Sequence, residues 1–280
     1  MAIVKKIAYN TIVSVIARVI STALALVIVG YLTRYLGQTG FGEYTTILAF
    51  LFIFTVLADL GLYSICVKNI SRPGADEVKI VSNAFTLRFF AGLFVFAIAP
   101  LAAYFFPYSL ETKMGIIIGA TGFWFLSNNQ VLMGVFQKYL QMDKVGLAEV
   151  LSRFVQLGLV VFFVWKSLGF LFIVSALVAG AAVNFFIVLF FVQKYTPIRF
   201  RFDFSFWLKL LKESLPLGLA AILTMIYFKL DTVMLSLMKT QADVGIYGLA
   251  YKILESLIFF PAMFVGLVMP LMSKYAFFNK

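Results

Sequence analysis

The sequence predicts an all-α, polytopic membrane protein with about eight transmembrane helices. Hydrophobic residues make up 63% of the 280-residue chain and charged residues only 12%, compared with roughly 45–50% and 25% in soluble domains. Apolar stretches of about 20 residues, the length of one membrane crossing, recur along the whole chain. A chain with so little polar surface is suited to a lipid bilayer, and this composition excludes a soluble globular domain.

Eight segments have the length and composition of a membrane-spanning helix. The first is too long for the hydrophobic region of a signal peptide, so we expect it to be retained. The fifth is the weakest, because Glu149 and Arg153 lie near its start. In chain order, the predicted spans are residues 11–32, 44–65, 84–106, 115–135, 147–165, 169–192, 215–238 and 247–271.

The basic residues alternate between the two ends of these spans. The odd-numbered loops between the spans hold one basic residue each, namely Arg34, Lys113, Lys166 and Lys239. The N-terminus, the even-numbered loops and the tail hold many more: Lys5, Lys6, Lys68, Arg72, Lys79, Lys138, Lys144, Lys194, Arg199, Arg201, Lys209, Lys212, Lys274 and Lys280. The positive-inside rule then predicts cytoplasmic N- and C-termini. This orientation explains the net charge of +11, and we expect no nucleic-acid partner.

The sixth loop, residues 193–213, is the longest basic stretch. Its aromatic residues Phe202, Phe204, Phe206 and Trp207 lie among Arg and Lys, a mixture that suits the headgroup layer of an anionic inner leaflet. We therefore expect membrane lipids as partners. The loop also divides the chain into a six-helix lobe over 1–192, a linker over 193–213, and two further helices over 214–280.

A weak internal repeat supports this division. Phe41-Gly42-Glu43-Tyr44 and Val244-Gly245-Ile246-Tyr247 each follow an apolar span and open the next one. Six spans separate the copies, so they are expected to be parallel repeats, an architecture of transporters. The final two helices would then begin a second lobe, and we expect the sequence to be truncated after the eighth helix. The alternative is a complete eight-span protein.

The composition argues against an enzyme. The chain has no histidine and a single cysteine, Cys66, so it lacks the commonest general base and any multi-cysteine metal site. We expect no catalytic residue, no metal ion and no cofactor.

Short motifs in order along the chain carry a resemblance to a known family. They are Lys5-Lys6 through Asn10, Tyr35-Leu36-Gly37-Gln38-Thr39-Gly40-Phe41-Gly42-Glu43-Tyr44, Ala58-Asp59-Leu60-Gly61-Leu62, Lys229-Leu230-Asp231-Thr232-Val233-Met234-Leu235, Val244-Gly245-Ile246-Tyr247, Ala250-Tyr251-Lys252 and Met269-Pro270-Leu271-Met272-Ser273. The chain resembles bacterial polysaccharide flippases, the O-antigen and capsule repeat-unit translocases of the multidrug/oligosaccharidyl-lipid/polysaccharide exporter superfamily. Members of this superfamily have two complete lobes.

The resemblance implies a transporter of the bacterial cytoplasmic (inner) membrane. Its cargo would be a polyprenyl-pyrophosphate-linked oligosaccharide for cell-surface polysaccharide, moved by alternating access through a cavity with cationic residues. A proton or sodium ion is the expected coupling ion. The alternatives are a multidrug or cation antiporter of the same superfamily, a non-transporting scaffold, and a membrane glycosyltransferase component.

Ionisable and polar groups at membrane depth are the candidate site residues. Arg18 and Lys229 are candidates for binding the pyrophosphate, the alternative for each being an ion pair between helices. Asn128 and Asn129 belong to a polar cluster that either binds sugar hydroxyls or joins helices. The ion-coupling candidates are Asp231, Asp59 and Glu255. For Asp59 a structural pair with Arg88 or Lys68 is the favoured alternative, and for Glu255 a pair with Lys252.

Overall fold

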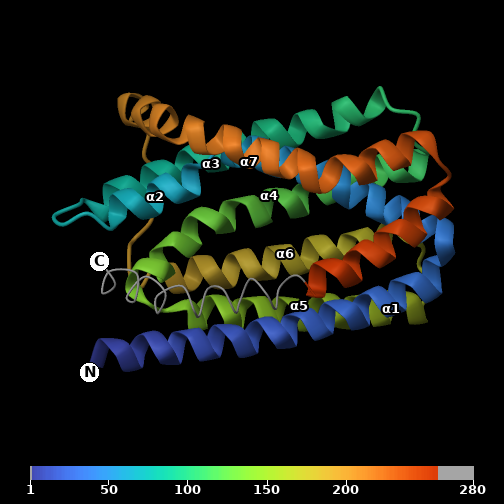
Figure 1. Cartoon of the computed structure of the whole chain (residues 1–280), viewed down its shortest axis with the longest axis horizontal. Helices are drawn as coiled ribbons and strands as arrows, with labels where there is room; N and C mark the ends of the chain where they lie inside the picture. The colour runs from blue at the N-terminus through green and yellow to red at the C-terminus, as the bar shows by residue number, and fades with distance from the viewer. Residues whose placement is uncertain (1, 258–280) are drawn as a thin grey trace, which may run out of the picture.

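The computed structural model describes residues 2–257, and these residues form an all-α protein. Apolar spans bounded by charged or turn-forming residues become long helices that lie lengthwise beside one another (Figure 1). The helices are α1 (Ala2–Asp59), α2 (Leu62–Ile70), α3 (Glu77–Tyr104), α4 (Leu110–Tyr139), α5 (Met142–Trp165), α6 (Phe170–Val192) and α7 (Phe204–Met238), followed by helical residues 241–257. The predicted fold class is confirmed.

Helix α1 contains the first two predicted spans. Gly37 interrupts it with φ 65° and ψ −172°, a conformation that glycine adopts without steric cost. Figure 1 shows the two arms of α1 running in opposite directions from this break. The second arm ends at Asp59, because Leu60 and Gly61 take positive φ values. The predicted end of the second span at residue 65 is therefore wrong, because the short helix α2 already begins at Leu62.

Four described helices are long and apolar enough to cross a membrane, and five if the bent pair in α7 counts as one span. One of them, 51 residues of α1, is long enough for its two arms to cross separately. Helix α4 has the length but not the apolarity, because the polar cluster from Ser127 to Gln130 lies in its second half. That cluster is mostly buried among other helices, which shields it from lipid. The eighth predicted span, 247–271, extends outside the described residues.

The basic loops gather at one end of the helices. Lys138 Nζ, in the last turn of α4, lies 2.5 Å from Oε1 of Glu77 in the first turn of α3. This ion pair brings the α4–α5 loop and the α2–α3 loop together. Lys79 Nζ lies 3.1 Å from Asp203 Oδ2, which adds the α6–α7 loop to this group. At the other end Ser109 Oγ donates to Glu43 Oε1 over 2.7 Å. The alternation read from the sequence therefore corresponds to two real ends of the molecule.

The predicted linker 193–213 is only partly a loop. It lacks helical structure up to Asp203, whose carboxylate accepts the backbone N–H of Phe206 over 3.0 Å and so caps α7 at its start. Residues 204–213 are already helical. The domain boundaries proposed from the sequence stay predictions.

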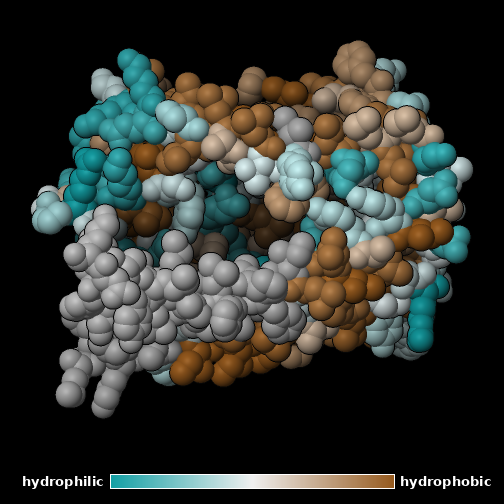
Figure 2. All heavy atoms as spheres, in the orientation of Figure 1, coloured by the Kyte–Doolittle hydropathy of each residue, from teal (hydrophilic) through white to brown (hydrophobic). Residues whose placement is uncertain are grey.

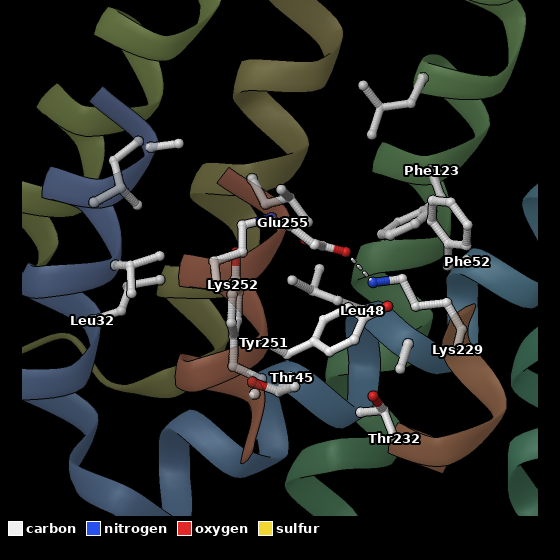
Figure 3. A pocket seen from close by; sticks show the side chains of 18 of the residues that line it. Leu32, Thr45, Leu48, Phe52, Phe123, Lys229, Thr232, Tyr251, Lys252 and Glu255 are labelled. Carbon is white, nitrogen blue, oxygen red and sulfur yellow. Dashed lines mark hydrogen bonds and ion pairs between the residues drawn. The ribbon is translucent and has the colours of Figure 1, made fainter. Parts of the chain in front are cut away.

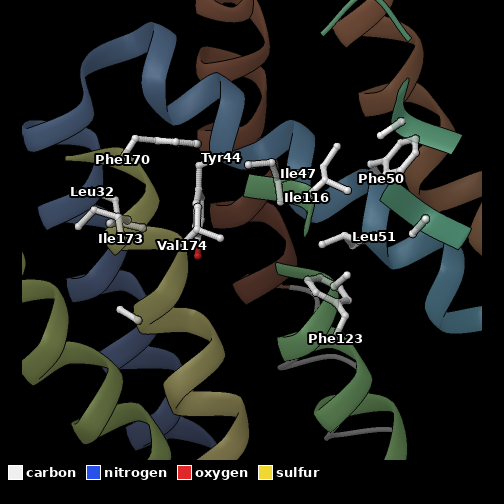
Figure 4. Packing of buried hydrophobic residues seen from close by; sticks show 14 of the residues in the cluster. Leu32, Tyr44, Ile47, Phe50, Leu51, Ile116, Phe123, Phe170, Ile173 and Val174 are labelled. Atoms are coloured by element: carbon white, nitrogen blue, oxygen red, sulfur yellow. The ribbon is translucent and has the colours of Figure 1, made fainter. Parts of the chain in front are cut away.

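Two apolar clusters hold the helices together. One surrounds the bend of α1, where Ile47 and Leu51 pack against Ile116 of α4 and Val174 of α6 (Figure 4). The other lies toward the basic end, around Val131 and Phe136. Many other large apolar side chains point outward, among them Phe94 at 69% exposure. Figure 2 shows this apolar surface between hydrophilic groups that gather toward the ends, as expected for a protein surrounded by lipid.

Candidate cavity between the helices

The larger cavity has a volume of about 470 Å³ and lies among α1, α4, α5, α6, α7 and residues 241–257. Its wall is apolar near Leu32 and Leu48, and α5, α7 and residues 241–257 contribute polar side chains to it. Figure 3 shows side chains of both parts, and Figure 2 shows a hollow with hydrophilic side chains inside it. The charged and amide side chains in this wall are Gln130, Arg153, Gln156, Lys229, Lys252 and Glu255.

Lys229 and Glu255 face each other inside this cavity. Lys229 Nζ lies 2.5 Å from Glu255 Oε1, and Lys252 Nζ lies 3.2 Å from Glu255 Oε2. The Lys229 ammonium also lies 4.7 Å from the centre of the Tyr251 ring and 5.5 Å from that of Phe52. One carboxylate is thus shared by two lysines, so the cluster keeps an excess positive charge. The pair of Lys252 with Glu255 expected from the sequence is present, and Lys229 joins it.

A smaller cavity of about 280 Å³ lies among α1, α4, α5 and α6. Arg18 lines it, and Arg18 Nη1 lies 2.9 Å from Glu149 Oε1 of α5. Asn129 also lines it and donates to Asn184 Oδ1 over 2.5 Å. Arg18 therefore makes the ion pair given as one alternative and also borders a cavity, while its role in binding a pyrophosphate stays a prediction.

Arg153 belongs to the walls of both cavities. Its Nη1 donates to Gln156 Oε1 over 2.8 Å, and within residues 2–257 its guanidinium makes no ion pair. Gln156 is likewise common to both walls. The two cavities therefore meet at a cation that pairs with no carboxylate among the residues that the structure describes.

Arg153 is not among the site residues predicted from the sequence, where it counts only as a charge that weakens the fifth span. A signal was present. Glu149, Ser152, Arg153 and Gln156 follow the spacing i, i+3, i+4 and i+7, which places them on one face of a helix. A polar stripe of this kind in an otherwise apolar span faces other protein segments or a water-filled cavity.

Asp59 lies outside both cavities and pairs with Arg88. The guanidinium of Arg88 is fully buried, contacts the Asp59 carboxylate, and donates to Ser127 Oγ over 3.2 Å and to Gln130 Oε1 over 2.7 Å. This is the structural pairing that the sequence favoured for Asp59. Gln130, in turn, lines the larger cavity.

Two further predicted site residues line neither cavity. Asn128 is buried, and its amide donates back to the Trp124 carbonyl over 2.8 Å. Asp231 accepts a hydrogen bond from Tyr247 on the neighbouring helix. The roles assigned to these residues in binding or ion coupling stay predictions.

At the non-basic end of the molecule, two glycines from the predicted repeats lie where the backbones of α1 and residues 241–257 approach each other closely. A Cβ atom on Gly42 would lie 1.7 Å from the carbonyl oxygen of Gln241, and one on Gly245 would lie 2.3 Å from that of Gln38. Gln38 and Gln241 occupy equivalent positions in the repeats, as do the two glycines, so the contact is reciprocal. Only a residue without a side chain permits this approach.

Comparisons with known proteins agree with this architecture. Over 159 residues the chain is 32% identical to the sporulation protein YkvU of Bacillus subtilis (strain 168), and the match covers 54% of this chain and 35% of that protein. The fold is similar to that of a multidrug resistance MATE family transporter of the MOP superfamily in its outward-facing conformation. The TM-score is 0.56 at 16% identity, over 89% of this chain and 62% of the transporter.

The family-level resemblance read from the sequence is therefore confirmed. The model of the family described as polysaccharide biosynthesis protein matches residues 7–276, nearly the whole chain. The chain belongs to the polysaccharide biosynthesis protein family and has the helical fold of a membrane transporter.

Proposed function

We propose that the protein transports a polyprenyl-pyrophosphate-linked oligosaccharide across the bacterial cytoplasmic membrane by alternating access. The observation that carries this proposal is the pair of adjoining cavities that share Arg153. Moving a phosphate group out of water costs several kcal/mol unless opposite charges and hydrogen bonds replace its hydration. Arg153 pairs with no described carboxylate and lies in the middle of α5 beside both cavities, so its guanidinium can supply that replacement.

The surrounding groups suit the other parts of such a cargo. Arg18 and Lys229 border the two cavities and can supplement Arg153, each after leaving its carboxylate partner. Guanidinium groups bind phosphate oxygens in bidentate fashion. Gln130 and Asn129 offer amides for sugar hydroxyls. The polyprenyl tail stays in lipid, so no covalent chemistry by the protein is required, and we propose that it is not an enzyme.

The charge of the cavities favours an anionic cargo over the cationic drugs of a multidrug antiporter. Four basic side chains line the two cavities together, namely Arg18, Arg153, Lys229 and Lys252, against the carboxylates of Glu149 and Glu255. A cationic drug would meet net repulsion in this setting.

The same proposal includes an orientation in the membrane. The basic end, with the loops around Lys138 and Arg201, would face the cytoplasm and the end with Gly42 the outside. A cysteine placed at the exposed Gln38 should then react with a membrane-impermeant maleimide in intact cells, whereas one at Ser205 should react only after permeabilisation. The native Cys66 is buried and need not be replaced. The opposite labelling pattern would refute the orientation.

Binding of defined probes to the purified chain in nanodiscs tests the cargo. Undecaprenyl pyrophosphate, neutral undecaprenol and the cationic dye ethidium differ in charge, and the first two share the same tail. Saturable binding of the pyrophosphate alone supports the proposal. Equal binding of undecaprenyl pyrophosphate and undecaprenol would mean that the protein recognises only the polyprenyl tail. Binding of ethidium alone would favour the multidrug antiporter.

A further inference from the structure

Residues 197–203, between α6 and α7, are fixed to α3 through their backbone. Three N–H groups on alternate residues donate to side chains of α3: Arg199 to Ser82 Oγ (3.2 Å), Arg201 to Thr86 Oγ1 (3.0 Å) and Asp203 to Asn83 Oδ1 (3.1 Å). The three acceptor residues are buried, and buried polar groups require hydrogen-bond partners. The position of this segment is therefore determined by α3 and not by its own exposed side chains.

The hydrogen bonds give the segment two different sides. Alternate N–H groups that point the same way indicate an extended backbone, whose successive side chains point in opposite directions. Phe200 and Phe202 lie on one side, where their ring centroids are 6.1 Å and 5.6 Å from that of Phe90 on α3. Arg199 and Arg201 fall on the other.

Both sides are open to the surroundings. Phe200 and Phe202 are 55% and 57% exposed, and they continue the exposed apolar surface of α3 that includes Phe90. Arg199 and Arg201 are exposed as well, and in the described part of the chain neither guanidinium makes an ion pair. An aromatic row beside a basic row, at the end of a membrane-spanning bundle, matches the boundary between acyl chains and headgroups.

We propose that this segment is a binding site for anionic phospholipids. The guanidinium groups of Arg199 and Arg201 hold the lipid phosphate, and the rings of Phe200 and Phe202 lie against the first part of the acyl chains. Charge complementarity selects anionic over zwitterionic headgroups. The site is separate from the cavities, because none of its residues lines either of them.

Native mass spectrometry of the full chain, with added phosphatidylglycerol or phosphatidylcholine, tests the site. A basic residue near an anionic surface contributes about fivefold in affinity, so Arg199→Gln with Arg201→Gln should weaken phosphatidylglycerol binding by roughly 10- to 30-fold. The matched control is Lys68→Gln with Arg72→Gln, which removes two exposed charges from the same end of the molecule. Arg199→Lys with Arg201→Lys should keep most of the affinity.

Equal weakening in the control would attribute the effect to overall charge and overturn the proposal. Unchanged phosphatidylglycerol binding in the double glutamine variant, at an unchanged melting temperature, would overturn it as well. A fall in melting temperature in the glutamine variant, with no recovery of binding in the lysine variant, would show that the arginines stabilise the fold and do not bind lipid.

Discussion

The Lys229 ammonium on α7 lies 2.5 Å from the Glu255 carboxylate on the following helix, and both side chains line the larger cavity. Lys252 contacts the other oxygen of the same carboxylate at 3.2 Å. This arrangement resembles an exchangeable pair, since an anionic cargo can take one lysine while the carboxylate keeps the other. We therefore expect replacement of Lys229 and replacement of Glu255 to have different effects on cargo binding and on stability.

Lys229→Gln should weaken binding of undecaprenyl pyrophosphate by roughly tenfold, because one charge-assisted hydrogen bond is lost. The fold should persist, since Lys252 still pairs with Glu255. Glu255→Gln should bind the probe at least as tightly as the unaltered protein, because it removes the competing carboxylate. Isothermal titration in nanodiscs measures both, with Lys68→Gln as the control. Weaker binding by Glu255→Gln than by Lys229→Gln would refute the exchange.

Asp59→Asn should destabilise the protein strongly. It leaves the guanidinium of Arg88, which has no exposed surface, without its carboxylate, and breaking a buried ion pair from one side costs roughly 3–5 kcal/mol. The double variant Asp59→Asn with Arg88→Met removes both charges and should recover part of the loss. Thermal unfolding in detergent measures these changes. A stable Asp59→Asn variant that binds its probe normally but no longer responds to proton or sodium gradients would instead establish ion coupling.

Gly42→Ala should open the non-basic end of the molecule. The new Cβ cannot occupy a position 1.7 Å from the Gln241 carbonyl oxygen, so the reciprocal contact with Gly245 must separate. A cysteine at Thr232, which is buried and lines the larger cavity, should then react faster with a maleimide added at that end. Gly30→Ala is the control, because its added Cβ meets no atom within 4 Å. Equal reaction rates in both backgrounds would mean that the glycines do not act as a gate.

The stability of the basic end should depend on pH through Glu77. Partial burial acts to raise the pKa of its carboxyl, but hydrogen bonds from Lys138 and Tyr139 outweigh this effect and hold the pKa below its ordinary value. A lowered pKa stabilises the folded state above the unfolded pKa, and this contribution is lost as the pH falls through the folded pKa. Glu77→Gln should therefore lower the melting temperature at pH 7, and the difference from the unaltered protein should shrink below about pH 4.5.

Glu111→Gln provides the comparison for this titration. Glu111 lies in the first turn of α4, as Glu77 does in that of α3, but its side chain is exposed and makes no ion pair within the described residues. Its replacement should shift the melting temperature little at pH 7, because it removes no ion pair between described residues. A difference between Glu77→Gln and the unaltered protein that stays constant down to pH 3 would contradict the assignment.

The helices could be predicted from the sequence because each depends on local composition. Apolar length marked the spans, and the alternation of Lys and Arg correctly separated the loops into two ends. The errors were local as well. The predicted second span runs past Asp59 because apolar residues continue after it in the sequence. In the structure the helix breaks at Leu60 and Gly61.

The cavities could not be predicted in the same way, because they depend on which helices become neighbours. The polar cluster of α4 illustrates this. Ser127 and Gln130 turn toward Arg88 of α3, whereas Asn129, between them in sequence, turns toward Asn184 of α6. Successive residues of a helix point in directions about 100° apart, so one motif serves several neighbours. The polar stripe on α5 indicates that Arg153 faces protein or water, but its place at the meeting of two cavities depends on five other segments.

The proposed transport requires Arg153 to bind the anionic head of the cargo where the two cavities meet. The most direct test is the affinity of the purified chain, in nanodiscs, for undecaprenyl pyrophosphate in the Arg153→Gln variant, with Arg72→Gln as the control at the surface. We expect Arg153→Gln to weaken binding by roughly tenfold or more at an unchanged melting temperature, and Arg153→Lys to retain part of the affinity. Unchanged affinity in a folded Arg153→Gln variant would show that Arg153 does not bind the cargo.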